Sequence, residues 1–156
     1  MRPSDEEFTA FLARVEPRVR RALSSSLGAA EGQSATQAAM TWAWENWSRV
    51  LGLSSPVGYL YRVGMTAATR GRSRELVVEA PFVTSISPEA GVDPEVLAAL
   101  DALSPQQRAA VLLVHGYGYS LRDAAEVLDL NPSTIRVHAQ RGLARLRRAL
   151  ERNHVH

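Results

Sequence analysis

The segment Ser120–Arg136, with the sequence SLRDAAEVLDLNPSTIR, decides the fold of the C-terminal part of the chain. Its first half predicts a short helix that contains the small residues Ala124 and Ala125. Asn131 and Pro132 then form a cap and the first position of a second helix. Small residues let two helices cross closely, so a tight turn between these helices completes the outline of a helix-turn-helix.

The second helix is expected from Pro132 to Arg152, and its two faces differ in chemistry. At about 100° per residue, one face carries Ile135, Ala139, Gly142, Leu143, Leu146 and Leu150. The opposite face carries Ser133, Val137, Gln140, Arg141 and Arg148, and Thr134 and Arg136 flank it. Arginine pairs with guanine, glutamine with adenine, and valine meets the thymine methyl group, so this face suits the major groove of DNA. An arginine-rich helix can also be a solvated surface, but the preceding turn and the amphipathic register favour DNA contact.

The composition describes a folded, water-soluble protein without thiol chemistry. The chain has 156 residues, of which 46% are apolar and 22% are charged, as in ordinary globular domains. Cysteine is absent, which excludes disulfides, cysteine-ligated metals and a thiol nucleophile. The net charge is only +2, but all 18 basic residues are arginine, whose guanidinium group can fork onto phosphates and guanine edges.

No targeting or membrane segment is expected. The chain begins with acidic residues where a signal peptide needs an apolar stretch, and the longest apolar run, Ala109–Val114, is too short to span a bilayer. The sequence therefore predicts a cytoplasmic protein without membrane insertion.

The pattern of apolar residues predicts helices along the rest of the chain. A capping box at Ser4 opens an amphipathic helix that carries Phe8 to Leu23, and a loop is expected over residues 24–28. Further helices are expected over residues 34–50, from Pro56 through Arg70, after Asp93-Pro94, after Ser104-Pro105 and over 121–130. Residues 75–92 lack a helical period and contain several Pro, Ser and Gly residues, which indicates a linker. The fold class is therefore all-α, with two helical domains joined by a flexible linker, the C-terminal one a helix-turn-helix.

Catalytic chemistry is not indicated. The four histidines are scattered, without companions at metal-ligand spacing, so neither a metal site nor another cofactor is expected. The chain also lacks a nucleophile elbow, a Gly-rich phosphate loop and a plausible pair of catalytic carboxylates. We therefore expect no enzyme.

Two stretches resemble bacterial sigma factors of the extracytoplasmic-function group, which keep only the second and fourth sigma domains. Residues 141–147, RGLARLR, resemble the family's RARARLR-like run, and residues 103–108, LSPQQR, precede it in the expected order. Residues 55–63, SPVGYLYRV, resemble the family's SPRAWLYRI. The resemblance implies a region 2-like domain over residues 5–74, a linker over 75–92 and a region 4-like domain over 93–153.

The resemblance also implies a function: a transcription initiation factor that binds RNA polymerase core enzyme and promoter DNA and makes no bonds of its own. Region 4 would read the −35 element and region 2 would melt the −10 element. Many members of the family are held by an anti-sigma factor, so such a partner is also implied. By motif position, the −35 readers would be Ser133, Thr134, Arg136, Val137, Gln140 and Arg141, which coincide with the polar face derived above.

The region 2-like part departs from the family pattern. The family's acidic DLVQE-like run, which contacts the polymerase clamp, is replaced by residues 34–38, SATQA, so the corresponding interface residues are Ser34, Gln37 and Ala38. Thr66 and Arg70 stand where the family places Asn and Asp in its −10 helix, followed by Gly71, a poor residue for a helix interior. These departures imply either altered promoter opening or an early end of that helix. With Tyr59 and Arg62, Thr66 and Arg70 are the −10 candidates. The usual glycine of the helix-turn-helix turn is replaced by Asp129, which can still adopt a left-handed conformation.

Single residues of region 2 add to this interpretation. Arg62, Arg70, Arg72 and Arg74 form a run without acids that suits strand phosphates, although cations also favour a helix C-terminus. Tyr59 and Tyr61 point to different faces, so one should be buried and one accessible. Trp44 and Trp47 are expected in the core.

Two alternatives remain. The helix over residues 133–138, STIRVH, also resembles the recognition helix of LuxR-like regulators, which bind duplex DNA without polymerase. The missing acids near Ser34 and Ala38 instead fit a degenerate sigma-like module that captures another protein.

Overall fold

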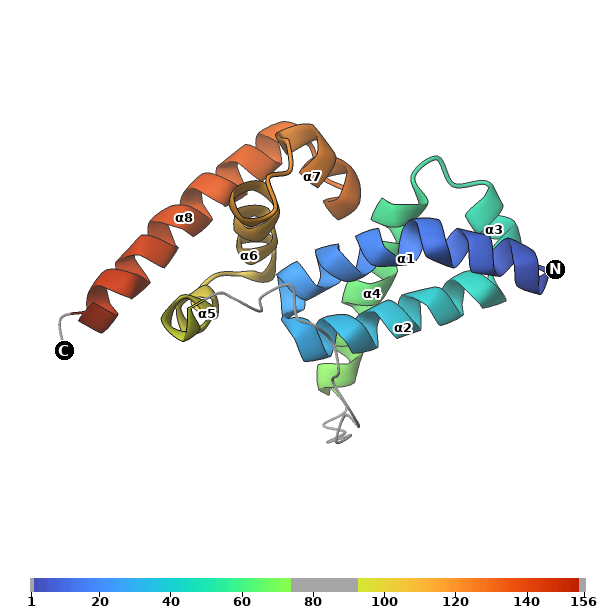
Figure 1. The fold of residues 1–156 in the computed structure, drawn as a ribbon, viewed down its shortest axis with the longest axis horizontal. Coiled ribbons are helices and arrows are strands. Elements are labelled where there is room, and N and C mark those ends of the chain that lie inside the picture. The colour runs from blue at the N-terminus through green and yellow to red at the C-terminus, as the bar shows by residue number, and fades with distance from the viewer. Residues whose placement is uncertain (1, 74–92, 155–156) are drawn as a thin grey trace.

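The computed structural model describes residues 2–73 and 93–154, and all the regular elements in these segments are helical. The N-terminal half contains α1 (Asp5–Leu27), α2 (Ala29–Glu45), α3 (Trp47–Leu51) and α4 (Pro56–Ser73). The C-terminal half contains α5 (Pro94–Leu100), α6 (Pro105–Val111), the π-helical turn η1 (Leu112–Gly116), α7 (Leu121–Leu128) and α8 (Pro132–His154). Figure 1 shows the long helix α8 at one side of the molecule and the α1, α2 and α4 group at the other. The expected linker over residues 75–92 lies outside the described residues.

Three helix starts have the predicted side-chain caps, at Ser4, Asp93 and Ser104. Ser4 and Glu7 form the expected capping box, in which the Ser4 hydroxyl accepts from the Glu7 amide at 3.2 Å. Ser104 forms a second capping box with Gln107, and Asp93 accepts from the Glu95 amide. These contacts lie within one turn of the chain, which is why the sequence alone locates them.

The N-terminal half is built around α1. Phe11, Val15, Val19 and Leu23 recur every four residues and are buried against α2 and α4. The prediction of a core position is confirmed for Trp47, which is 5% exposed. Trp44 is only half-buried and packs edge-on against Phe8 with ring centroids 5.0 Å apart.

The prediction of a loop over residues 24–28 is wrong, because α1 continues through Leu27. Ser24, Ser25 and Ser26 are buried, and their small side chains permit a close crossing with α2. A Cβ atom added at Gly32 would lie 2.5 Å from the Ser24 Cα atom. The serines are therefore packing residues, and Gly28, with a φ of 91°, forms the corner instead.

Other boundaries in this half also differ from expectation. The second helix begins at Ala29 rather than residue 34, and it ends at Glu45; the side-chain amide of the following Asn46 donates to the Trp42 carbonyl at 3.0 Å. The backbone of Asn46 leaves the helical conformation, with φ −122° and ψ 40°, and residues 47–51 form the separate helix α3. Helix α4 does not end early at Gly71 but continues to Ser73.

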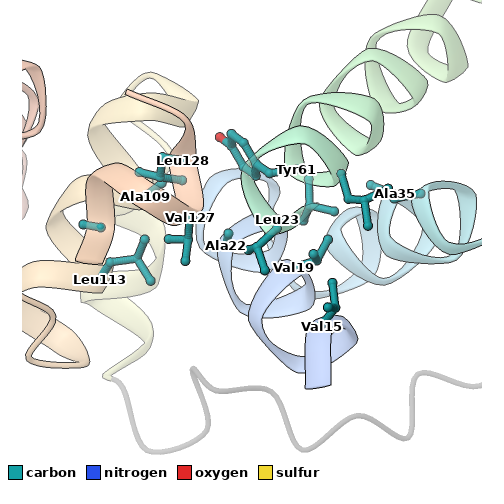
Figure 2. Packing of buried hydrophobic residues seen from close by; sticks show 14 of the residues in the cluster. Val15, Val19, Ala22, Leu23, Ala35, Tyr61, Ala109, Leu113, Val127 and Leu128 are labelled. Atoms are coloured by element: carbon teal, nitrogen blue, oxygen red, sulfur yellow. The ribbon is translucent and has the colours of Figure 1, made fainter. Parts of the chain in front are cut away.

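The two halves share one buried apolar cluster. Helices α1 and α4 contact α7, and α1 also contacts α6. Figure 2 shows Val127 of α7 on the side that faces Ala22 of α1, with Leu113 and Ala109 behind it. A second cluster, between α5, α6 and α8, includes Leu100, Val111 and Leu146. The halves are thus docked on each other in addition to having cores of their own.

Candidate nucleic-acid interface

The turn between α7 and α8 fixes the direction of the second helix. Asp129 adopts a left-handed conformation, with φ 55° and ψ 49°, and ends α7. The Leu130 amide then donates to the Ala125 carbonyl at 2.9 Å, and the Asn131 carbonyl accepts from the Ile135 amide at 3.0 Å. An aspartate tolerates this conformation better than most residues other than glycine, so the turn forms despite the substitution.

The inner face of α8 packs closely on α6 and α7. Ile135 is fully buried, and Ala139 is buried one turn later. A Cβ atom at Gly142 would lie 2.7 Å from Val111 Cγ2 and 3.0 Å from the Gln107 carbonyl oxygen. Glycine at this position therefore lets α6 and α8 cross at close range, which fixes the rotation of α8 about its axis.

The opposite face of α8 carries the predicted −35 residues toward solvent. Thr134 is half-buried, and Val137 is 40% exposed, an unusual environment for a large apolar side chain. The exposed members of the set are Ser133, Arg136, Val137, Gln140 and Arg141. The structure thus places all six on one accessible surface, called here the α8 outer face.

Charge on the α8 outer face is not neutralised locally. Within residues 2–73 and 93–154, neither Arg136 nor Arg141 forms an ion pair with a carboxylate. By contrast, Arg145 donates to Gln107 Oε1 at 2.9 Å and is held against α6. Two guanidinium groups are therefore left to approach phosphates or guanine edges.

The −10 candidates lie on α4, and they differ in their surroundings. Tyr59 is half-buried, packs on Trp42 with ring centroids 5.3 Å apart, and accepts a hydrogen bond from Arg49 at 3.3 Å. Arg49 also lies 5.6 Å from the centre of the Trp42 ring. Thr66 and Arg70 are exposed further along the helix. The α4 surface thus offers aromatic and cationic groups of the kind that bind single strands.

Tyr61 is the buried member of the tyrosine pair. Its hydroxyl lies 2.7 Å from the Ser26 hydroxyl. Burial raises the pKa of Tyr61, and the hydrogen bond with Ser26 opposes that rise. Tyr61 is therefore a neutral core residue, and only Tyr59 is accessible.

Arg62 connects two sets of candidate residues. Its guanidinium group lies 3.2 Å from Asp129 Oδ2, in the turn of the helix-turn-helix. Sequence reasoning singled out both residues but missed this pairing, because no local signal joins positions so far apart in the chain.

The candidate polymerase interface forms a third surface, on α2. Ser34 and Gln37 are exposed and Ala38 is half-buried. Glu31 and Glu45 are exposed near the two ends of this row. The structure thus leaves the three predicted residues accessible and adjacent on one helix face.

Comparison with known proteins agrees with the fold and with the C-terminal helices. Residues 94–146 match the family described as sigma-70, region 4. The sigma factor RpoE of Bartonella quintana, solved in complex with the anti-sigma factor NepR, superposes with a TM-score of 0.60 at 23% identity. The match covers 94% of this chain and 98% of that one. A comparison with curated protein sequences gives no match.

The predicted resemblance to sigma factors is therefore confirmed for the region 4-like part, residues 94–146. Residues 94–146 are similar to the sigma-70 region 4 family, and the all-α fold is similar to that of the solved sigma factor.

Two further findings concern the described segments alone. None of their helices has the length and apolar character needed to cross a membrane. Nor do these segments bring together three or more side chains that could ligate a metal ion.

Proposed function

We propose that this protein is a sigma factor that recruits RNA polymerase core enzyme to promoters and carries out no bond-making step itself. Residues 5–74 act as the region 2-like domain and residues 93–153 as the region 4-like domain. The α8 outer face reads the −35 element in the major groove, and the exposed side of α4 holds the opened −10 strand. The protein works in the cytoplasm, where the polymerase and the promoter are found.

One observation carries this proposal. The left-handed turn at Asp129 and the close crossing at Gly142 fix α8 so that its polar half is accessible. That half carries groups able to bond base edges and a valine able to meet a thymine methyl group. The same residues are those that the resemblance to sigma factors implies as the −35 readers, and they lie within the matched residues 94–146.

An anti-sigma factor is a further proposed partner. The similar RpoE structure contains the anti-sigma factor NepR. A regulator of this class would bind this chain and withhold it from polymerase. The proposal is tested by whether a bound regulator competes with core enzyme.

The decisive experiment is co-elution of the purified protein with RNA polymerase core enzyme, with a known sigma factor as competitor. Competable binding is the expected result. A folded protein that does not bind core would overturn the proposal and favour the second candidate, a sigma-like module that captures another protein. One observation favours that alternative: Ser34 and Ala38 stand on the accessible face of α2 where the family pattern has acidic residues.

A pair of variants tests the α2 face directly. Ser34→Asp with Ala38→Glu restores the family's acidic positions and should tighten binding to core enzyme, because the clamp interface would regain charge complementarity. Thr9→Asp with Ala13→Glu makes the same charge change on exposed positions of α1 and is the control. Equal effects of the two pairs would show that α2 is not the interface.

A further inference from the structure

A cavity of about 510 Å³ lies beside the first turns of α1. Its walls come from α1, α3 and the segment that leads into α4. In Figure 1, α3 and the start of α1 lie at the same end of the molecule. The volume falls within the range of small-molecule pockets, about 300–1,000 Å³. None of the −35, −10 or polymerase candidates lines this cavity, so the proposed function leaves it unused.

The floor of the cavity is apolar and fixed in shape. Phe11, Trp47 and Val50 line it, and each of them is at most 5% exposed. The rings of Phe11 and Trp47 meet edge to face, with centroids 5.2 Å apart and planes at 88°. Such a pair holds both rings in one orientation, so the floor is formed before any ligand enters.

One wall of the cavity is apolar surface that faces solvent. Leu51, the last residue of α3, is 62% exposed, which is unusual for a large apolar side chain. Leu53 and Pro56 continue this wall toward α4. An apolar ligand in the cavity would remove part of this surface from water, which is favourable.

Arg14 supplies a charge at the edge of the cavity. It is exposed, and it forms no ion pair with a carboxylate in the part of the chain that the structure describes. Glu7 also borders the cavity but lies two turns away, about 10 Å along the axis of α1. The Glu7 carboxylate is already engaged, because it accepts from the Ser4 amide at 3.3 Å. The charged group that remains available is therefore a guanidinium, which binds carboxylates well.

The start of α4 favours a ligand of the same sign. Pro56 is the first residue of this helix and borders the cavity. The preceding Ser55 does not cap the helix, because its buried hydroxyl has no hydrogen-bond partner among the described residues. The positive end of the α4 dipole therefore lacks this side-chain cap, and a nearby anion would be stabilised by it.

We propose that this cavity binds a small amphipathic anion, consisting of an apolar chain or ring that carries one carboxylate. The apolar part occupies the floor formed by Phe11 and Trp47. The carboxylate accepts hydrogen bonds from the Arg14 guanidinium group. The inference goes beyond the proposed function, and it is tested without polymerase or promoter, so the two can fail independently.

Three probes that share either the tail or the head test this chemistry. Isothermal titration calorimetry measures their binding to the natural chain, at concentrations below those at which they form micelles. Decanoate combines an apolar chain with a carboxylate, decyltrimethylammonium has the same chain with a cation, and acetate has the carboxylate alone. Decanoate should bind at least about tenfold more tightly than the other two, because each of them lacks one of the recognised groups. No binding of decanoate to the folded chain would overturn the proposal, as would equal binding of decyltrimethylammonium.

A pair of arginine variants tests the head group. Arg14→Gln removes the guanidinium group and should raise the Kd for decanoate about tenfold. Arg20→Gln is the matched control, because Arg20 lies on the same helix, pairs with Glu16 at 2.9 Å and does not line the cavity. Equal weakening by both variants would mean that the overall charge of the chain attracts the ligand, which contradicts the assignment to Arg14.

A pair of tryptophan variants tests the location. Ala10 borders the cavity and is exposed, so Ala10→Trp fills the mouth without disturbing the core. Ala13→Trp places the same side chain at an exposed position of α1 outside the cavity. Circular dichroism should show the same helix content in both variants, and only Ala10→Trp should lose decanoate binding. Retained binding in a folded Ala10→Trp protein would place the ligand elsewhere and overturn the proposal.

Discussion

Replacing Ser26 with alanine should destabilise the protein more than replacing Tyr61 with phenylalanine, although each removes the same hydrogen bond. The two hydroxyls lie 2.7 Å apart in the core, and the Ser26 hydroxyl also lies 3.1 Å from the Ala22 carbonyl oxygen. A serine hydroxyl carries one proton, so while Tyr61 is neutral we assign the Ser26 proton to the Ala22 carbonyl and the Tyr61 proton to Ser26. The two substitutions therefore leave different groups behind.

Tyr61→Phe removes a donor and leaves Ser26 bonded to Ala22, so it should cost about 1 kcal/mol, the net value of one hydrogen bond. Ser26→Ala leaves the Tyr61 hydroxyl buried without an acceptor, which costs about 1–3 kcal/mol. Alanine returns about 0.5 kcal/mol through its higher helix propensity. We expect a net loss of about 2 kcal/mol for Ser26→Ala.

Urea unfolding followed by circular dichroism measures both free energies of unfolding, and the double variant completes a cycle. Ser26→Ala with Tyr61→Phe removes both polar groups, so it should be more stable than Ser26→Ala alone. A double variant that loses the sum of the two single costs, or a Ser26→Ala protein as stable as Tyr61→Phe, would refute the assigned direction of the hydrogen bond.

Three further predictions concern Tyr61, Gly64 and Arg141. The raised pKa of Tyr61 means that the unfolded chain loses this proton first as pH rises above about 10. The free energy of unfolding should therefore fall more steeply there than in Tyr61→Phe, as measured by denaturant titration across alkaline pH. Gly64→Ala would place a Cβ atom 2.6 Å from a Leu23 methyl carbon, so it should lower Tm through a loss of about 1–3 kcal/mol, whereas exposed Gly71→Ala should raise it. Arg141→Ala should weaken binding to a −35 duplex by about 1–3 kcal/mol in fluorescence anisotropy, and an equal loss on unrelated duplexes would identify a phosphate contact instead.

Features that depend on contacts between residues close together in the chain could be predicted from the sequence. Features that depend on contacts between distant residues could not. Caps at Ser4, Asp93 and Ser104 bond groups within a single turn, so their positions could be predicted. The α8 outer face could also be derived, because the rotation of one helix follows from its apolar period once one side is buried.

The remaining features depend on partners distant in sequence. Residues 24–26 were expected in a loop because serines are poor helix formers, but Gly32 and Tyr61 surround them and make small buried hydroxyls suitable. The Arg62–Asp129 pair joins the N-terminal and C-terminal halves of the fold, and nothing local to either residue indicates the other. Tertiary context overrode propensity in the first case and created a new contact in the second.

Gly58 and Asp129 each lower the stability of the element that contains them. Both lie at the contact between α4 and the turn that follows α7. Glycine in a helix lowers the stability of the helix by about 0.5–1 kcal/mol relative to alanine. Aspartate in the left-handed conformation has a higher backbone energy than the glycine it replaces. Both costs apply whether the domains are docked or apart. The compensating close approach and the Arg62 ion pair exist only when they are docked. The two residues therefore favour the arrangement in which the two halves of the chain are docked on each other.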